Sequence, residues 1–162
     1  MIDLNIIRVD YHDPVQAADL IDLLDAYARD PMGGGKPLAP RVRRELVAEL
    51  ATRPQVFSLL AYVGEEPVGL VNCLESFSTF SCQPIINIHD FMIVKHWRGR
   101  GLSQPLLERV EGIARAAGCC KLTLEVLGGN HAARVAYRRF GFSNYQLDPS
   151  AGQAEFWHKP LE

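Results

Sequence analysis

The spacing of apolar residues changes along the chain, and each change predicts a different element. Ile2, Leu4 and Ile6 alternate with polar residues, which is the period of a half-buried edge strand. Residues 14–30 and 40–52 instead carry apolar side chains every three or four positions, as amphipathic helices do. The pattern therefore predicts a strand followed by two helices.

Glycine and proline mark the turns between these segments. Residues 56–63 and 67–76 are apolar runs of strand length, and Gly64-Glu65-Glu66 joins them as in a hairpin. The stretch from Pro31 to Pro37 holds three successive glycines and cannot continue a helix. We expect it to be a mobile loop.

The second half of the chain alternates strands and helices. The helix over 102–117 is the clearest of these elements, because its apolar residues share one face and Gly118 follows as a stop signal. Since no repeat, low-complexity tract or linker interrupts the pattern, residues 1–162 are expected to form one α/β domain. The remaining expected elements are strands over 85–94, 119–126 and 153–159, and a short helix over 130–139.

Composition and charge restrict the class of protein. Of the 162 residues, 48% are hydrophobic and 22% are charged, which is typical of a globular domain. No apolar run approaches the roughly 20 residues that span a bilayer, and the N-terminal residues do not resemble a secretion signal. The net charge of −2 lacks the basic excess typical of nucleic-acid binding. We therefore expect a cytoplasmic protein without a membrane or nucleic-acid partner.

The cysteines do not form a recognisable metal or redox motif. Cys73, Cys82, Cys119 and Cys120 include no CxxC pair and no zinc-ligand spacing. We expect all four to be reduced, to serve mostly in packing, and to bind no metal.

The junction over 93–104 is the most informative part of the sequence. A strand runs into a basic turn with Gly99 and Gly101, which opens directly onto a helix. The first N–H groups of a helix lack intrahelical partners and the dipole is positive at that end, so this turn suits an anion such as phosphate. Arg98 and Arg100 would add charge. A tight turn with surface arginines is the alternative interpretation.

Two common phosphate motifs fit this junction poorly. A P-loop needs Lys and Ser or Thr after its last glycine, but Leu102 follows Gly101. A dinucleotide fingerprint would place a third glycine at Gln104. A Rossmann-type oxidoreductase is therefore disfavoured.

Residues 98–103 (RGRGLS) are similar to a signature of the GNAT (GCN5-related N-acetyltransferase) superfamily, Arg/Gln-x-x-Gly-x-Gly/Ala, with Ser103 at the last position. A second segment, Asn130-x-x-Ala-x-x-x-Tyr137-x-x-x-Gly-Phe142, follows the closing motif of the family. The order of predicted elements matches the family fold over about residues 2 to 160. The strand end NIHDFMIV and the C-terminal FWHK are also similar to the diamine acetyltransferase branch.

The resemblance implies a fold and a cofactor. The fold is α/β, with a mixed, mostly antiparallel sheet of six to seven strands and about four flanking helices. The strands 85–94 and 119–126 would splay apart to admit acetyl-CoA, and the family acts without a metal. The residues expected to bind the cofactor are Met92, Ile93, Arg98, Gly99, Arg100, Gly101, Leu102, Ser103 and Asn130.

The resemblance also implies N-acetyl transfer by direct attack of a primary amine, and this reaction needs two proton operations. An alkylammonium must lose a proton before it attacks. His89 lies where many members carry a base, Asp90 is the second candidate, and a polar filler between strands is the alternative for His89. Tyr137 lies where the family commonly carries the acid for the leaving thiolate; a core aromatic is its alternative.

The acceptor and partners are less defined by the sequence. Asp13, Asp19, Asp22, Asp25 and Asp30 give the first helix an acidic character, which would attract a cationic amine or simply face solvent. We expect a small-molecule or peptide amine as acceptor and a homodimer as the assembly, as in many family members. A non-catalytic acyl-CoA-binding module is the alternative function.

Overall fold

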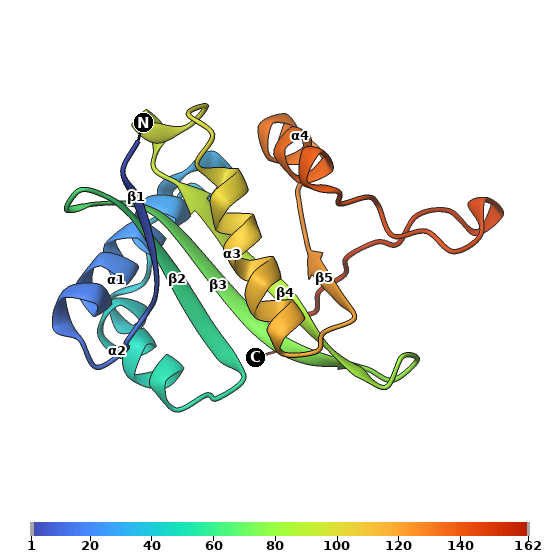
Figure 1. Cartoon of the computed structure of the whole chain (residues 1–162), viewed down its shortest axis with the longest axis horizontal. Helices are drawn as coiled ribbons and strands as arrows, with labels where there is room; N and C mark the ends of the chain where they lie inside the picture. Colours follow the sequence, from blue (N-terminus) through green and yellow to red (C-terminus); the bar gives the residue numbers. More distant parts are fainter. Residues whose placement is uncertain (1, 162) are drawn as a thin grey trace. The chain divides into compact units, whose positions relative to one another are not determined.

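The computed structural model describes residues 2–161. The chain forms two compact units, Met1–Leu124 and Glu125–Glu162. Figure 1 shows that the first unit contains the sheet and three of the helices. Within the described residues, no helix is both long and apolar enough to cross a membrane.

A single sheet of five strands, in the order β1-β2-β3-β4-β5, is the centre of the first unit. Neighbouring strands are antiparallel except for β4 and β5, which run parallel. β1 lies at one edge, as the alternation of its residues predicted. The strands are β1 (Leu4–Arg8), β2 (Val56–Val63), β3 (Glu66–Ser78), β4 (Gln83–Ile93) and β5 (Lys121–Leu124).

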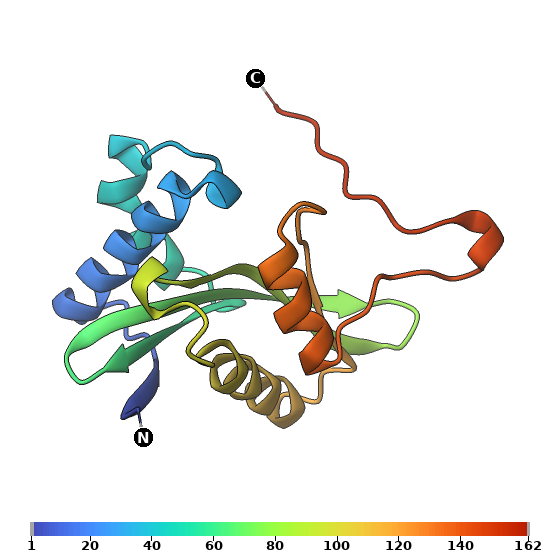
Figure 2. The same ribbon diagram turned by 90° about the horizontal axis from the view of Figure 1, so that it is seen from above.

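Helices cover both faces of this sheet. Figure 2 shows α1 (Pro14–Arg29) and α2 (Pro40–Ala51) on one side and α3 (Ser103–Ala116) on the other. α1 begins where the sequence predicts, because the Asp13 carboxylate accepts hydrogen bonds from the N–H groups of the first turn and Pro14 occupies the first helical position.

The core has one apolar layer on each face of the sheet. On the α1 side, buried Leu20 packs in one cluster with Leu70 of β3 and Met92 of β4. On the α3 side, a Cβ added to Gly69 would lie 2.9 Å from Ile93 Cδ1 and 3.0 Å from Leu106 Cδ1. The missing side chain at Gly69 therefore lets α3 approach the middle of the sheet closely.

Within the stretch where the two strands pair, β4 contains one residue more than β3. Asn72 of β3 lies opposite Asp90, whereas the next residue, Cys73, lies opposite Ile88. His89 is therefore the extra residue of a β-bulge. Because the bulge interrupts the alternation of the strand, His89 and Asp90 need not face opposite sides of the sheet.

The pairing between β4 and β5 covers only the first part of β4. Ile85 lies opposite Lys121 and Ile88 opposite Leu124, and no later pair follows although β4 continues to Ile93. The last residues of β4 thus pair with β3 on one edge and with no partner from β5 on the other.

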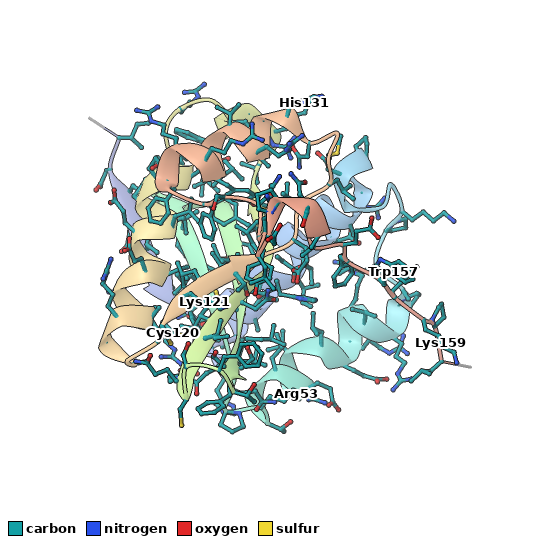
Figure 3. The ribbon with its side chains drawn as sticks, turned by 90° about the vertical axis from the view of Figure 1, so that its right-hand side faces the viewer. Arg53, Cys120, Lys121, His131, Trp157 and Lys159 are labelled. Carbon is teal, nitrogen blue, oxygen red and sulfur yellow. The ribbon has the colours of Figure 1, made fainter. Side chains whose placement is uncertain are left out.

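The second unit contains α4 (His131–Phe140) and a long segment without strands. The predicted closing strand over 153–159 is wrong, and so is the expected total of six to seven strands, because the described residues form five. A strand needs a neighbour for its backbone groups. The segment has one backbone bond to the preceding chain, Ala154 N to Tyr145 O at 3.1 Å. Trp157, which Figure 3 labels, is 83% exposed.

The four cysteines are free thiols in the structure and differ in environment. Cys73 is buried in β3, and burial raises the pKa of its thiol to about 12, with Asp90 adding to the effect. Cys82 and Cys120 are exposed; Figure 3 labels Cys120 just before β5 begins. The packing role predicted for the cysteines therefore applies to Cys73 and not to these two. Within residues 2–161, no group of His, Cys, Asp and Glu could hold a metal ion.

Candidate active site

The turn between β4 and α3 has the backbone that its glycines predicted. A short 3-10 helix, η2 (Lys95–Trp97), follows β4, and the chain then passes through Gly99 at φ 75° and Gly101 at φ 83°. These are left-handed conformations that a side chain rarely adopts. A Cβ at either position would meet no atom within 4 Å, so conformation rather than crowding requires glycine here.

The N-terminus of α3 lacks a side-chain cap. Leu102 occupies the cap position and is only 5% exposed. Its side chain has no oxygen that could accept a hydrogen bond from the N–H groups of the first turn. The backbone N–H groups of Ser103 and Gln104 therefore remain at the positive end of the helix dipole. This arrangement, directly after the two left-handed glycines, can accommodate an anionic group such as a pyrophosphate.

The two arginines of the turn have different roles. Arg98 donates from Nε to the Ile93 carbonyl at 2.9 Å and from Nη2 to Asp30 Oδ2 at 2.9 Å. Arg100 is exposed, and its guanidinium lies 4.8 Å from the centre of the Trp97 ring. Arg98 thus ties the turn to β4 and to the end of α1, whereas Arg100 keeps its charge at the surface.

The backbone directions in β4 distinguish the two residues expected to bind the cofactor. Val94 N–H donates to Val68 O at 2.9 Å, so the backbone N–H and C=O groups of the even-numbered residues at this end of β4 point toward β3. Met92 follows that direction, and its side chain is buried. The backbone N–H and C=O groups of Ile93 point away from β3, toward the edge that β5 leaves unpaired. Backbone contacts to a ligand at that edge therefore suit Ile93 better than Met92.

The acidic residues of the first helix are mostly engaged within the protein. The Asp25 carboxylate receives Arg29 Nε at 2.8 Å and Arg43 at 3.2 Å, and the Arg29 bond holds its pKa below the ordinary value. The proposed attraction of an amine to this acidic run is thereby weakened, because each carboxylate has a partner. Asp13 caps α1, Asp19 accepts from Tyr62, Asp22 pairs with Arg43, and Asp30 accepts from Met32 N and Arg98.

The glycine-rich segment after α1, where the sequence predicted a loop, forms several hydrogen bonds. It contains the 3-10 helix η1 (Pro31–Gly33), and the N–H groups of Gly33 and Gly35 both donate to the Asp30 carbonyl. A Cβ at Gly33 would lie 1.9 Å from the Tyr27 carbonyl oxygen. The segment folds back closely onto α1, and this contact requires glycine at position 33.

A buried polar network crosses three strands of the sheet and ends at the β-bulge. It was not expected from the sequence, where only the presence of Asn72 in an apolar run could have indicated it. Ser58 and Asn72 are 0% and 6% exposed. The network consists of Tyr11 Oη and Ser58 Oγ at 2.9 Å, Ser58 Oγ and Asn72 Oδ1 at 2.6 Å, and Asn72 Nδ2 and Asp90 Oδ2 at 2.9 Å.

His89 and Asp90, the two candidates for the base, differ in their surroundings. His89 is exposed at the bulge, whereas Asp90 is partly buried and hydrogen-bonded to Asn72. Asp90 also lies near Tyr27 of α1: burial raises the pKa of the Tyr27 hydroxyl, and the charges of Asp90 and Asp30 raise it further. Asp90 is therefore on the α1 side of the sheet.

Asn130 and Tyr137, the remaining candidates, both belong to the second unit. Asn130 caps α4, because its Oδ1 accepts from Ala133 N at 3.2 Å; the cap leaves its side-chain NH₂ able to donate elsewhere. Tyr137 is 8% exposed and packs edge-on against Phe142, with ring centres 5.9 Å apart. Each residue thus has a structural role in its own unit.

Comparison with known proteins gives a consistent result. A family model described as the Acetyltransferase (GNAT) family matches residues 20–142. The thialysine N-epsilon-acetyltransferase of Caenorhabditis elegans is 29% identical over 89 residues, which cover 55% of this chain and 55% of that protein. The curated relatives that match are aligned over only 35% and 55% of their own lengths.

Solved structures agree with the fold. A probable acetyltransferase superposes with a TM-score of 0.80 and 19% identity, covering 98% of both chains. An aminoglycoside acetyltransferase from an uncultured soil metagenomic sample, in complex with sisomicin, gives a TM-score of 0.78 and 16% identity over 98% of this chain and 97% of that one. At these identities the likeness establishes a mixed α/β fold shared with acetyltransferases.

Proposed function

Because the chain belongs to the GNAT family of acetyltransferases, we propose that it transfers an acetyl group from acetyl-CoA to a primary amine, which attacks the thioester directly. The observation that carries this proposal is the turn over residues 98–103. Its two left-handed glycines lead into the uncapped N-terminus of α3, directly beside the edge of β4 that β5 leaves unpaired.

The residues of the turn fit the pyrophosphate of acetyl-CoA. Gly99 and Gly101 leave open space where side chains would be, and the N–H groups that start α3 favour negative charge. Arg100 would contribute charge, whereas Arg98 holds the turn in place through Ile93 and Asp30. Leu102 and Ser103 complete the turn, and Met92 packs in the core cluster on the α1 side of β4.

Other groups of the chain would act on the acetyl-bearing arm. The Ile93 carbonyl accepts from Arg98, but the Ile93 N–H at the open edge of β4 suits donation to an extended ligand, which would stabilise charge that develops on the acetyl oxygen. The Asn130 side-chain NH₂ is the second candidate contact. Acetyl-CoA itself supplies the activated acyl group.

Two side chains would handle protons. His89, exposed at the bulge, would take the proton of the attacking amine directly or through a water, because a nitrogen of a neutral imidazole ring can accept a proton. Tyr137 would donate a proton to the leaving thiolate. Support for Tyr137 comes from its position in the closing motif of the family, and support for His89 comes from its place on the strand where many members carry a base.

The acceptor is proposed to be a small-molecule amine. The names of two similar proteins, a thialysine N-epsilon-acetyltransferase and an aminoglycoside acetyltransferase, support this class of acceptor. We further propose that residues 1–162 act as one acetyltransferase domain, in the cytoplasm and as a homodimer. The exposed apolar side chains of Phe156 and Trp157 support an assembly that covers them.

Calorimetric titration with acetyl-CoA, followed by an assay of free-thiol release over a panel of amines, tests the proposal. We expect binding, and thiol release that depends on one class of amine. Binding without release on any amine would favour a non-catalytic acyl-CoA module. Absence of binding would contradict the assignment of residues 98–103.

A further inference from the structure

The polar network defined above (Tyr11, Ser58, Asn72 and Asp90) has a fixed direction. A carboxylate only accepts hydrogen bonds, so the group of Asn72 that faces Asp90 must be its NH₂, and its carbonyl oxygen must face Ser58. The single hydroxyl proton of Ser58 is then donated to Asn72. Tyr11 must therefore donate its own proton to Ser58. Every donor in the network points toward Asp90.

This direction presents a hydrogen-bond donor to the Asp90 carboxyl group. A hydrogen bond donated to a carboxylate stabilises the charge, and a donor held in a buried network cannot rotate away. Ser58 and Asn72 are both buried, so their orientations are fixed by packing as well as by hydrogen bonds. The network thus holds a negative charge at a defined place in β4.

No cation of the described chain, residues 2–161, forms an ion pair with this charge. Asp90 has a neutral amide as its partner. In contrast, the nearby carboxylates Asp25 and Asp30 each pair with an arginine. A partly buried carboxylate that the fold orients without a counter-ion is suited to bind a cation from solution.

The position of Asp90 connects this charge to the proposed reaction. Asp90 lies three residues before Ile93, on the part of β4 that extends beyond β5. It lies near Tyr27, close to the end of α1, and Asp30 at that end is bonded to Arg98 of the cofactor turn. The charge is therefore held between the proposed cofactor turn and α1.

We propose that Asp90 binds the ammonium group of the acceptor amine, and that Tyr11, Ser58 and Asn72 are positioning residues that hold its carboxylate; this inference rests on the proposed function. The assignment gives different roles to Asp90 and His89, which the sequence left as alternative candidates for the base. A carboxylate attracts an ammonium group but, as a weak base, removes its proton poorly. His89 beside it is then left to accept the proton.

Binding of a minimal cation tests the site without turnover. The probe is n-butylammonium, with uncharged n-butanol as its matched control, titrated into the ¹⁵N-labelled full chain and followed by backbone amide shifts. We expect n-butylammonium to shift the amides of residues 89–93, n-butanol to leave them unchanged, and Asp90→Asn to abolish the difference. Equal shifts by both probes, or by wild type and Asp90→Asn, would overturn the proposal.

Kinetics test the positioning residues. Asn72→Leu removes the hydrogen bond to the Asp90 carboxylate and should raise the KM for the amine about tenfold, the loss typical of a hydrogen bond to a charged group. Ser58→Ala removes a bond to the neutral Asn72 amide and should raise this KM in the same direction but less, and with both variants the KM for acetyl-CoA should stay within about twofold. Tyr62→Phe is the control, because it removes a Tyr–Asp hydrogen bond elsewhere in this unit. Equal changes in the two KM values would indicate a merely structural role and contradict the proposal.

The two experiments separate this inference from the function on which it rests. Charge-selective binding at residues 89–93 without thiol release on any amine would contradict the acetyltransferase proposal and leave the cation site. Thiol release with an amine KM that is unaffected by Asp90→Asn would contradict the cation site and leave the acetyltransferase.

Discussion

Arg98 Nη2 lies 2.9 Å from Asp30 Oδ2, although 68 positions separate the two residues in sequence. The same guanidinium donates to the Ile93 carbonyl. Asp30 in turn caps η1, because its carboxylate accepts from Met32 N. One ion pair thus fixes the proposed pyrophosphate turn against both the end of β4 and the segment that follows α1.

This pair predicts that a residue outside the turn controls cofactor binding. Arg98→Ala should raise the Kd for acetyl-CoA about tenfold, and Asp30→Asn should raise it in the same direction, because each change frees the turn. Arg98→Lys should not restore affinity, since an ammonium cannot make both bonds of the planar guanidinium. Calorimetry measures all three variants.

The control for that experiment is Arg41→Ala, which removes an exposed ion pair with Glu45 on α2. We expect no change in Kd. A double-mutant cycle with Arg98→Ala and Asp30→Asn should be strongly non-additive; strictly additive effects would show that the two side chains act separately.

The left-handed glycines predict a conformational cost without a steric one. Gly99→Ala and Gly101→Ala should each reduce the free energy of unfolding by about 1 kcal/mol and weaken acetyl-CoA binding, because a Cβ disfavours positive φ. Urea unfolding measures the first effect. Gly112→Ala is the matched control. A Cβ at position 112 would also meet no atom within 4 Å, but Gly112 lies within α3, where alanine should raise the free energy of unfolding by up to about 1 kcal/mol.

Tyr137→Phe tests the proposed acid. Phenylalanine keeps the edge-on contact with Phe142, so the thermal midpoint should change little. Thiol release should fall about a hundredfold, whereas the Kd for acetyl-CoA should be retained. Tyr145→Phe serves as a control in the same unit. If Tyr137→Phe keeps full turnover, the hydroxyl is not the acid and the residue is a core aromatic.

His89→Gln tests the proposed base. Glutamine preserves hydrogen bonding but cannot accept a proton near neutral pH, so kcat should fall about a hundredfold with little change in the KM for the amine. An unchanged kcat would assign proton removal to another group. A change confined to the KM would give His89 a binding role instead.

Acid should destabilise the fold through Asp25. The hydrogen bonds from Arg29 and from Leu38 N lower the pKa of Asp25 below its ordinary value of 3.8. A lowered folded-state pKa stabilises the protein above the unfolded pKa, and that contribution is lost as the pH falls through the folded value. Asp25→Asn should therefore lower the thermal midpoint at pH 7, and the difference from wild type should shrink below about pH 4.

Asp22→Asn is the control for this prediction. Asp22 also pairs with Arg43, but its side chain is 72% exposed. Since exposed ion pairs contribute little, its thermal midpoint should match wild type throughout the pH range. An equal effect of both substitutions would show that burial of Asp25 is not the cause.

Periodicity was sufficient to locate the helices. The residues 14–30, 40–52, 102–117 and 130–139 predicted as helical agree with α1 to α4 to within one residue at each end. Local signals determine such elements: the Asp13 cap, the proline starts and the glycine after α4. The segment 153–159 has the composition of a strand but lacks a partner, and pairing is a property of the whole fold that local sequence does not encode.

The candidate site was predicted where a motif is contiguous and missed where it is dispersed. Gly99 and Gly101 lie in one turn, so their role could be inferred from spacing. The polar network joins residues from four separate segments, and only the strand register brings Asn72 opposite Asp90. The bulge determines that register, and no residue type marks its position in the sequence.

The extra residue in β4, His89, separates two stretches of buried side chains in this strand. Ile86 and Ile88 precede His89 in β4, and Met92 follows it. Because of the extra residue, the alternation of side chains after His89 is shifted by one position relative to the alternation before it. A substitution at His89 leaves both stretches in place. Deleting His89 would remove the bulge and leave both sets of buried side chains on their present faces, whereas a one-residue deletion or insertion elsewhere in β4 would shift one stretch against β3 and turn its buried side chains to the opposite face. The position of a length change in β4 therefore decides how far it disturbs the core.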